Sequence, residues 1–246
     1  MGIFGLPGTG KSTLVRKLME TITSVAICKT HAAASVLNGK TIDYFVGRYI
    51  RNGSFGGNAL FIDEISQVEC SLIADLYKLV YMKVQTIIIG DFHQLPPVTP
   101  HTWKGQVQDE DVVEKSLALW RMCGGQYVEL KENMRSDQVL FDYYSKLISE
   151  PMDLEDAKRS FPKKEGHPRW SLVVPHRLRI KINGVQNKFE KPKDAVFIKK
   201  VKSSGPNKPQ NMWIYPGQVL RSSVTKKPIQ NGCFYTIKAI GEEVQF

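Results

Sequence analysis

The chain has 246 residues, of which 42% are hydrophobic and 24% are charged, a composition typical of a globular protein with one large domain or two smaller ones. It contains no apolar run long enough to cross a membrane and no signal-peptide pattern, so we expect an intracellular protein, in either the nucleus or the cytoplasm. The net charge of +10 comes wholly from residues 131–246, which hold 22 Lys+Arg and 12 Asp+Glu, whereas residues 1–130 hold 12 of each. Such a basic half is consistent with a nucleic-acid partner and equally with a solvated Lys-rich surface.

The first motif lies within the first twelve residues. Apolar Ile3-Phe4 leads into GLPGTGKS at residues 5–12, which fits G-x-x-x-x-G-K-[ST], and the amphipathic pattern of residues 12–20 predicts a helix directly after it. A glycine-rich loop between a strand and a helix presents backbone N–H groups to phosphate oxygens. The alternative is a glycine-rich turn that ends in Lys-Ser by chance. We expect a nucleotide to bind at Gly5, Leu6, Pro7, Gly8, Thr9, Gly10, Lys11, Ser12 and Thr13, with Lys11 on the β- and γ-phosphates and the Ser12 hydroxyl on Mg²⁺.

Apolar segments then alternate with helical patterns. Residues 25–28, 59–63 and 84–90 are nearly continuous apolar runs, typical of buried parallel strands, and residues 71–82 have the apolar spacing of a helix. This alternation predicts an α/β fold with a parallel, doubly wound sheet that binds ligands at the carboxyl ends of its strands. Polar residues follow each run, so we expect them to share one edge of the sheet.

The third strand ends in Asp63-Glu64. We expect Asp63 to hold Mg²⁺, directly or through water, and Glu64 to orient and deprotonate an attacking water. An alternative is that the pair caps a helix in a loop. After the fourth strand, Gln94 of GDFHQLPPV, residues 90–98, is placed to contact the γ-phosphate or the hydrolytic water, although a strand followed by a Pro-rich turn has the same composition.

The sequence changes in character near residue 130, where we place a domain boundary. Residues 138–148 predict one more helix, and residues 151–169 are rich in Lys and Pro. Beyond them, residues 171–174, 177–182, 195–198, 217–220 and 234–240 have the composition of short strands. Turn signals at 183–184, 203–206 and 231–232 separate these segments.

Four motifs in this order, GLPGTGKS, FIDE, GDFHQLPPV and LKENMR (residues 130–135), resemble superfamily 1 helicases. The similarity is greatest to the RecD-like branch that includes the PIF-type enzymes. This resemblance implies a RecA-like ATP-binding domain at residues 1–130, and a partial second motor domain with a β-rich, basic insertion at residues 131–246. It also implies ATP and Mg²⁺ as cofactors and single-stranded DNA as the partner.

The resemblance also implies roles for single residues. Lys11, Glu64, Gln94 and Arg135 match catalytic positions, with Gln94 coupling the state of the γ-phosphate to the nucleic acid. Arg135 stands where the family has an arginine that stabilises charge on the transferred phosphoryl group; an isolated arginine here would otherwise be a surface residue.

Nucleic-acid contacts are implied for Thr30, His31, Thr41 and Trp213. The family more often has Pro-Thr at residues 29–30 and a histidine at residue 43, where this chain has Lys29 and Asp43. Thr30 at a helix N-cap and Trp213 in a small core are the competing interpretations.

Other family motifs have no match in this chain. We find no Gln-Gly segment of the DNA-contacting type and no terminal Ala-Leu-Ser-Arg-like stretch, and the adenine-contacting glutamine motif would precede Met1. The resemblance therefore implies a helicase incomplete at both ends, which binds and hydrolyses ATP without unwinding a duplex alone. Two alternatives remain: a P-loop kinase of small molecules such as nucleosides, and a non-catalytic nucleic-acid-binding remnant.

Overall fold

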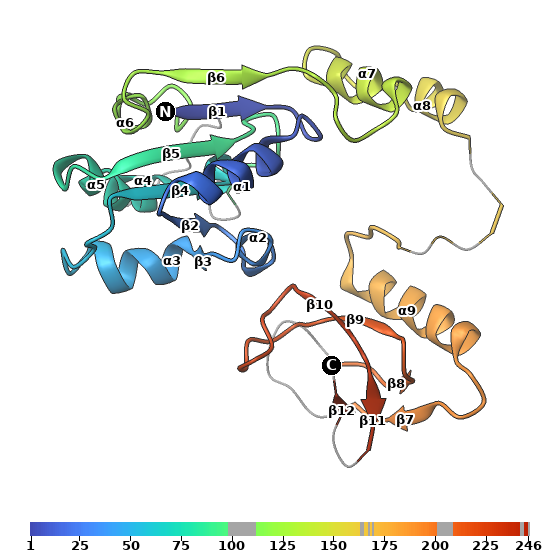
Figure 1. The fold of residues 1–246 in the computed structure, drawn as a ribbon. Helices are drawn as coiled ribbons and strands as arrows, with labels where there is room; N and C mark the ends of the chain where they lie inside the picture. The colour runs from blue at the N-terminus through green and yellow to red at the C-terminus, as the bar shows by residue number, and fades with distance from the viewer. Residues whose placement is uncertain are drawn as a thin grey trace. The chain divides into compact units, whose positions relative to one another are not determined.

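Six parallel strands form the centre of the first part of the molecule (Figure 1). The computed structural model describes residues 1–97, 112–162, 165–166, 168, 170–200, 209–241 and 244–245. It divides into two units, Met1–Asp153 and Leu154–Phe246. The strands of the first unit are β1 (Gly2–Gly5), β2 (Val25–Cys28), β3 (Lys40–Thr41), β4 (Ala59–Asp63), β5 (Gln85–Gly90) and β6 (Tyr127–Leu130), in the spatial order β3-β2-β4-β5-β1-β6.

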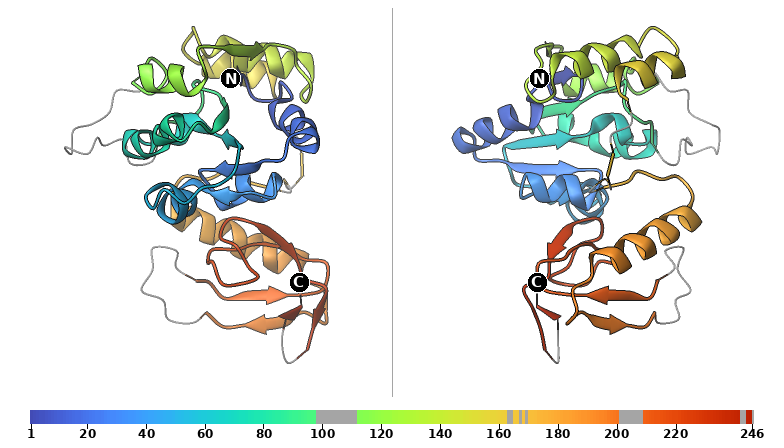
Figure 2. Two further views of the ribbon diagram at one scale, coloured as in Figure 1. Left: turned by 60° about the vertical axis from the view of Figure 1, so that its left-hand side comes forward. Right: turned by 90° about the vertical axis from the view of Figure 1, so that its right-hand side faces the viewer.

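Helices cover both faces of this sheet. They are α1 (Lys11–Thr21), α2 (His31–Val36), α3 (Ile42–Phe45), the π-helix η1 (Val46–Ile50), the 3₁₀-helix η2 (Ile65–Gln67), α4 (Cys70–Leu76), α5 (Lys78–Tyr81), α6 (Leu117–Met122) and α7 (Gln138–Lys146). In the left view of Figure 2, α1 (dark blue) lies on one side of the sheet and α4 and α5 (teal) lie on the other. The predicted α/β fold with a parallel sheet is therefore confirmed.

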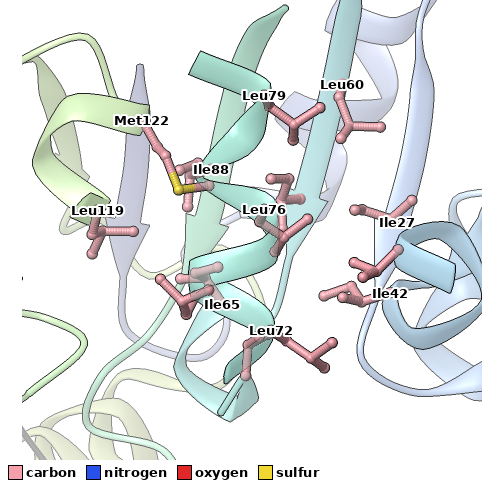
Figure 3. Close-up of a cluster of buried hydrophobic side chains, with 14 of the residues drawn as sticks. Ile27, Ile42, Leu60, Ile65, Leu72, Leu76, Leu79, Ile88, Leu119 and Met122 are labelled. Carbon is pink, nitrogen blue, oxygen red and sulfur yellow. The ribbon is translucent and has the colours of Figure 1, made fainter. Parts of the chain in front are cut away.

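The hydrophobic core has two parts, one on each face of the sheet. Because successive side chains of a strand point to opposite faces, Ile88 packs with α3 to α6, whereas Ile87 and Ile89 pack with α1 and α2. Figure 3 shows the larger cluster, in which Leu76 of α4 lies among side chains from strands and helices and is fully buried. Continuous apolar strands are what this two-sided burial requires.

The second unit consists of two helices and short antiparallel strand pairs. Its helices are α8 (Leu154–Ser160) and α9 (His176–Glu190). The pairs are β7 (Val196–Ile198) with β8 (Met212–Ile214), β9 (Val219–Arg221) with β10 (Phe234–Thr236), and β11 (Ala239–Ile240) with β12 (Val244–Gln245). The strand predictions for residues 195–198, 217–220 and 234–240 thus coincide in large part with β7, β9, β10 and β11.

Two strand predictions in this region are wrong. Residues 177–182 lie in α9, which continues through the expected turn at 183–184, and residues 171–174 form no strand. The apolar residues Leu178, Ile182, Val185 and Phe189 recur at the helical spacing of four, three and four, which prevails over the helix-breaking tendency of Gly184. The expected turn at 203–206 lies outside the described residues.

The division of the chain into two units falls between residues 153 and 154, later in the sequence than the boundary that composition places near residue 130. Strand β6 and helix α7 belong to the first unit. The assignment of residues 131–246 to a second motor domain remains a prediction. Over the described part of the chain, no helix has the length and apolar character needed to cross a membrane.

Truncating the core should cost much of the stability of the first unit. Leu76→Ala removes a fully buried side chain, and we expect it to lower the free energy of unfolding by about 2–5 kcal/mol, measured by urea denaturation. Val36→Ala, at a position 57% exposed in α2, should change it by less than about 0.5 kcal/mol. Equal losses in the two variants would contradict this description of the core.

Candidate nucleotide site

Five loops leave the same edge of the parallel sheet. Strands β1, β2, β4, β5 and β6 all run in one direction, so the residues that follow them gather at their carboxyl ends (Figure 1). Strand β1 lies between β5 and β6, which places the loop of residues 5–12 beside the ends of those two strands. Four of the five segments carry sequence-predicted catalytic or metal-binding residues.

Glycines allow the phosphate loop its shape. A Cβ on Gly5 would lie 2.3 Å from the carbonyl oxygen of Leu130, and Gly8 and Gly10 have φ of 83° and 85°. Helix α1 begins at Lys11 with no side-chain cap, so its N-terminal end remains open to an anion. The Lys11 ammonium donates to the carbonyls of Gly5 (2.6 Å) and Leu6 (2.8 Å), which holds it over the loop.

The charge of Lys11 is surrounded by the other candidate residues. Burial lowers the pKa of Lys11, the negative charges of Asp91 and Asp63 oppose this shift, and the positive charge of Arg135 adds to it. Asp91 and Arg135 follow β5 and β6, and Asp63 is the last residue of β4. The structure thus brings Lys11, Asp63 and Arg135 within electrostatic range of one another, as the motifs predict.

The two carboxylates at the end of β4 are desolvated. Burial raises the pKa of Asp63, although the backbone N–H of Glu64, which donates to Asp63 Oδ1 at 2.9 Å, and the charge of Lys11 oppose the rise. Burial raises the pKa of Glu64 as well, and the charge of Asp63 adds to it. Glu64 precedes η2 without capping it through its side chain, so the helix-cap alternative does not account for this residue.

The backbone of Glu64 is strained. Its φ of 56° lies in the left-handed region, which costs a non-glycine residue about 1–3 kcal/mol. Such conformations cluster at functional sites, where the surrounding structure holds them. A carboxylate with a raised pKa in a fixed orientation is suited to accept a proton from water.

Asp91 is a site residue that the sequence analysis did not single out. It is buried at the end of β5, where its Oδ2 accepts from Gln94 Nε2 at 3.1 Å and its Oδ1 accepts from the backbone N–H of His93 at 3.0 Å. The predicted sensor Gln94 is therefore oriented by Asp91. An acidic residue directly after an apolar strand, the signal that identified Asp63, could have identified Asp91 too. Val98, the last residue of this motif, lies outside the described residues.

Arg135 follows β6 in a loop that packs on the phosphate loop. The backbone N–H of Met134 donates to the carbonyl of Gly8 at 2.9 Å. A Cβ on Gly8 would lie 3.3 Å from the Cβ of Arg135, so the arginine backbone passes directly over this glycine. The Arg135 side chain itself is exposed.

A protein-family model described as an AAA domain matches residues 1–146, which is more than half of the chain. The chain belongs to the AAA domain family. It is 31% identical over 166 residues to the ATP-dependent DNA helicase PIF1 of Mus musculus, an alignment that covers 56% of this chain and 25% of that protein. It is 32% identical over 174 residues to Pif1 of Bdellovibrio bacteriovorus, covering 57% and 38%. The chain thus matches between a quarter and two fifths of the length of these relatives.

Two solved structures have a similar fold. The crystal structure of Bacteroides Pif1 bound to ssDNA has a TM-score of 0.69 at 18% identity, covering 99% of this chain and 67% of that chain. Pif1 from Candida albicans has a TM-score of 0.64 at 21% identity, covering 97% and 65%. The predicted resemblance to superfamily 1 helicases of the Pif1 type is confirmed, and so is the RecA-like sheet.

Three of the four residues predicted to contact DNA lie at the β2 and β3 side of the Pif1-like sheet edge. Thr30 and Thr41 are N-caps, with their hydroxyl oxygens accepting from the backbone N–H groups of Ala33 (3.2 Å) and Tyr44 (3.4 Å). The structure thus bears out the helix-cap interpretation of Thr30. His31 is half-buried at the start of α2. A role of these residues in binding DNA stays a prediction.

The two departures from the family pattern contact one another. Lys29 Nζ lies 3.3 Å from Asp43 Oδ2 and 2.7 Å from Glu69 Oε2. Lys29 is thus paired with two carboxylates.

Trp213 belongs to the second unit, in β8. Its ring lies 4.9 Å from that of Phe197, and Lys191 Nζ lies 4.0 Å from its centroid. Its backbone N–H and carbonyl pair with the side chain of Asn187 at 2.7 Å each. These contacts give Trp213 a structural role within its own unit, and base stacking by it stays untested.

Removing the buried charge of Asp63 should stabilise the protein. Because the folded-state pKa of Asp63 is raised, its contribution to stability falls as the pH rises through that pKa, and it is unfavourable at neutral pH. Asp63→Asn should therefore raise the thermal midpoint by a few degrees at neutral pH, and the difference should shrink as the pH falls toward about 4.

Asp75 provides a control of opposite sign. Burial opposes the shift, but hydrogen bonds from Lys78 and Arg51, each at 2.9 Å, outweigh it and lower the pKa of Asp75. Asp75→Asn should lower the midpoint at neutral pH. A lower midpoint for Asp63→Asn would show that the Asp63 charge is compensated in the folded state.

Proposed function

We propose that this chain binds ATP with Mg²⁺ and hydrolyses it, as the first motor domain of a Pif1-like helicase that acts on single-stranded DNA. The observation that supports this most directly is the convergence of Lys11, Asp63, Glu64 and Arg135 on one phosphate loop. A phosphate loop alone would serve many nucleotide-binding proteins. The Asp-Glu pair at the end of β4, with Asp63 buried and Glu64 half-buried, and an arginine loop packed on Gly8 are parts that hydrolysis of a nucleoside triphosphate needs.

The chemistry follows from these positions. Lys11 and the backbone N–H groups of residues 8–12 hold the β- and γ-phosphates. Glu64 accepts a proton from water as the water oxygen bonds to the γ-phosphorus and the bond from that phosphorus to the ADP oxygen breaks. The charge that develops on the phosphoryl oxygens is stabilised by Lys11 and Arg135. Gln94, oriented by Asp91, lies after the adjacent strand and contacts the γ-phosphate or the water.

The residues present fit a magnesium ion. Ser12 lies in the first turn of α1, and the buried carboxylate of Asp63 lies at the end of β4. The described residues include no group of three or more His, Cys, Asp or Glu that could hold a metal ion. Mg²⁺ in nucleotide sites is bound through one or two protein groups together with phosphates and water. When bound, Mg²⁺ would neutralise charge on the β- and γ-phosphate oxygens.

Two features favour single-stranded DNA as the partner. The second unit, residues 154–246, holds 19 Lys+Arg and 7 Asp+Glu, which is the positive surplus that a phosphate backbone attracts. Thr30, His31 and Thr41 lie at the same sheet edge as the nucleotide site, so contacts there would connect the strand to the state of the nucleotide. The similarly folded Bacteroides Pif1 is bound to ssDNA in its crystal structure.

Lys11→Ala should reduce ATP turnover by about 100-fold or more, because it removes the charge that the phosphates contact. Lys17→Ala, an exposed position of the same helix, is the matched control and should leave turnover unchanged. Glu64→Gln should retain binding of a fluorescent ADP derivative while losing turnover. Turnover of the three variants is measured as phosphate release, and nucleotide binding is measured by fluorescence. Full turnover in Lys11→Ala would refute the assignment of the site.

Single-stranded DNA should stimulate ATP hydrolysis. The logarithm of the affinity of the chain for this DNA should fall linearly with the logarithm of the salt concentration, because the basic second unit displaces counterions from the DNA when it binds. The measurements are phosphate release and fluorescence anisotropy with a labelled oligonucleotide across a salt series. Transfer of the γ-phosphate to a nucleoside, without any effect of DNA, would instead indicate a kinase. Salt-dependent DNA binding without turnover would indicate a non-catalytic remnant.

A further inference from the structure

Helix α7 and the loop before it contact two peptide groups of the phosphate loop from far along the chain. The hydroxyl of Tyr144 donates to the carbonyl of Pro7 at 2.7 Å, and the backbone N–H of Met134 donates to the carbonyl of Gly8 at 2.9 Å. Two consecutive peptide groups of the loop, those of the Pro7 and Gly8 carbonyls, thus accept hydrogen bonds from residues outside the loop. Because a trans peptide is planar, fixing each carbonyl also fixes the direction of the N–H in the same peptide.

A polar network extends from Tyr144 to the backbone of Arg135. Asn133 Oδ1 accepts from the backbone N–H groups of Arg135 (3.2 Å) and Ser136 (3.1 Å) and from Ser136 Oγ (3.2 Å), and Asn133 Nδ2 donates to the Ser136 carbonyl at 2.7 Å. Ser136 Oγ lies 3.5 Å from the hydroxyl of Tyr144. Because the Tyr144 proton goes to Pro7, a hydrogen bond across this contact takes the single Ser136 proton away from Asn133 Oδ1, so the two bonds of Ser136 alternate. We call Asn133, Ser136 and Tyr144 the latch.

Packing holds the latch in place. A Cβ on Gly8 would lie 3.3 Å from Arg135 Cβ and 3.4 Å from the Tyr144 hydroxyl, so the two groups meet over this glycine. The ring of Tyr144 packs edge-on against Phe141 at 5.2 Å. The start of α7 is capped by Asp137, whose Oδ1 accepts from the backbone N–H of Leu140 at 2.8 Å, and this ties the helix to the arginine loop.

We infer that Tyr144 is a positioning residue for hydrolysis: through the latch it fixes the backbone of Arg135 relative to the phosphate loop. This inference rests on the proposed function. The Arg135 side chain is long and exposed, so its guanidinium can be placed accurately only if its backbone is anchored. The latch connects that backbone to Pro7, and the neighbouring Met134 connects it to Gly8.

Tyr144→Phe removes one hydroxyl and keeps the ring that packs on Phe141. We expect the kcat of DNA-stimulated ATP hydrolysis to fall about three- to tenfold, the size of one lost hydrogen bond, with a smaller change in KM and a thermal midpoint lowered by no more than a few degrees. Ser136→Ala, which removes the hydroxyl between Asn133 and Tyr144, should lower kcat in the same direction. Tyr127→Phe deletes a hydroxyl at the amino end of β6, the end of the strand away from the nucleotide site, and should have no effect.

A double-mutant cycle separates positioning from a general structural effect. If Tyr144 acts through Arg135, then Tyr144→Phe should lower kcat in the natural chain and add little once Arg135→Ala is present. An unchanged kcat in Tyr144→Phe, or losses that multiply in the double variant, would overturn the inference. If Lys11→Ala abolishes turnover while Tyr144→Phe does not alter it, the proposed function stands and only the role of Tyr144 fails. If the natural chain shows no turnover that depends on Lys11, the proposed function itself fails.

Discussion

The pairing of β1 with strands on both sides is the constraint on which the site depends. Gly5 pairs with Leu130 at the end of β6, and Phe4 pairs with Gly90 at the end of β5. The backbone at Gly5 comes so close to the Leu130 carbonyl that no side chain fits there. Because all these strands run in parallel, this register delivers residues 5–12, the segment after β5 and the arginine loop to one place, although the first and the last of these are more than 100 residues apart in sequence. Once the strands are in this register, the composition of the nucleotide site depends on which residues stand at the carboxyl end of each strand.

That edge of the sheet works against stability. Asp63 is a buried carboxylate with a raised pKa, Lys11 is a partly desolvated ammonium, and Glu64 has a strained backbone. Each feature opposes folding, and each serves a site that must bind a highly charged ligand and hold a proton acceptor in a fixed position. The compensation comes from the two apolar clusters on either face of the sheet, which keep the ends of β4 and β5 rigid.

The sequence predicts the buried strands well because two-sided burial leaves apolar runs such as residues 59–63. It does not reveal β6, since Tyr127–Leu130 is an edge strand with largely exposed side chains and no apolar run. In the segment after Pro175, β-branched residues and a following Asn-Gly favour a strand, but the apolar spacing of four, three and four is that of the helix it forms. The contacts of Tyr144 have no local signal at all. Its partner Pro7 is 137 residues away, and only the assembled sheet brings the two together.

Charge is distributed unequally between the two units, and this bears on how the proposed DNA contact would work. Residues 1–153 hold 15 Lys+Arg and 17 Asp+Glu, and Lys29, the cation nearest Thr30 in sequence, is already paired with Asp43 and Glu69. The first unit therefore has no surplus of positive charge, and the surplus of the chain lies in the second unit. In the proposed function, the first unit would sense the strand through short-range contacts beside the nucleotide, while the second unit would supply the salt-dependent part of the affinity.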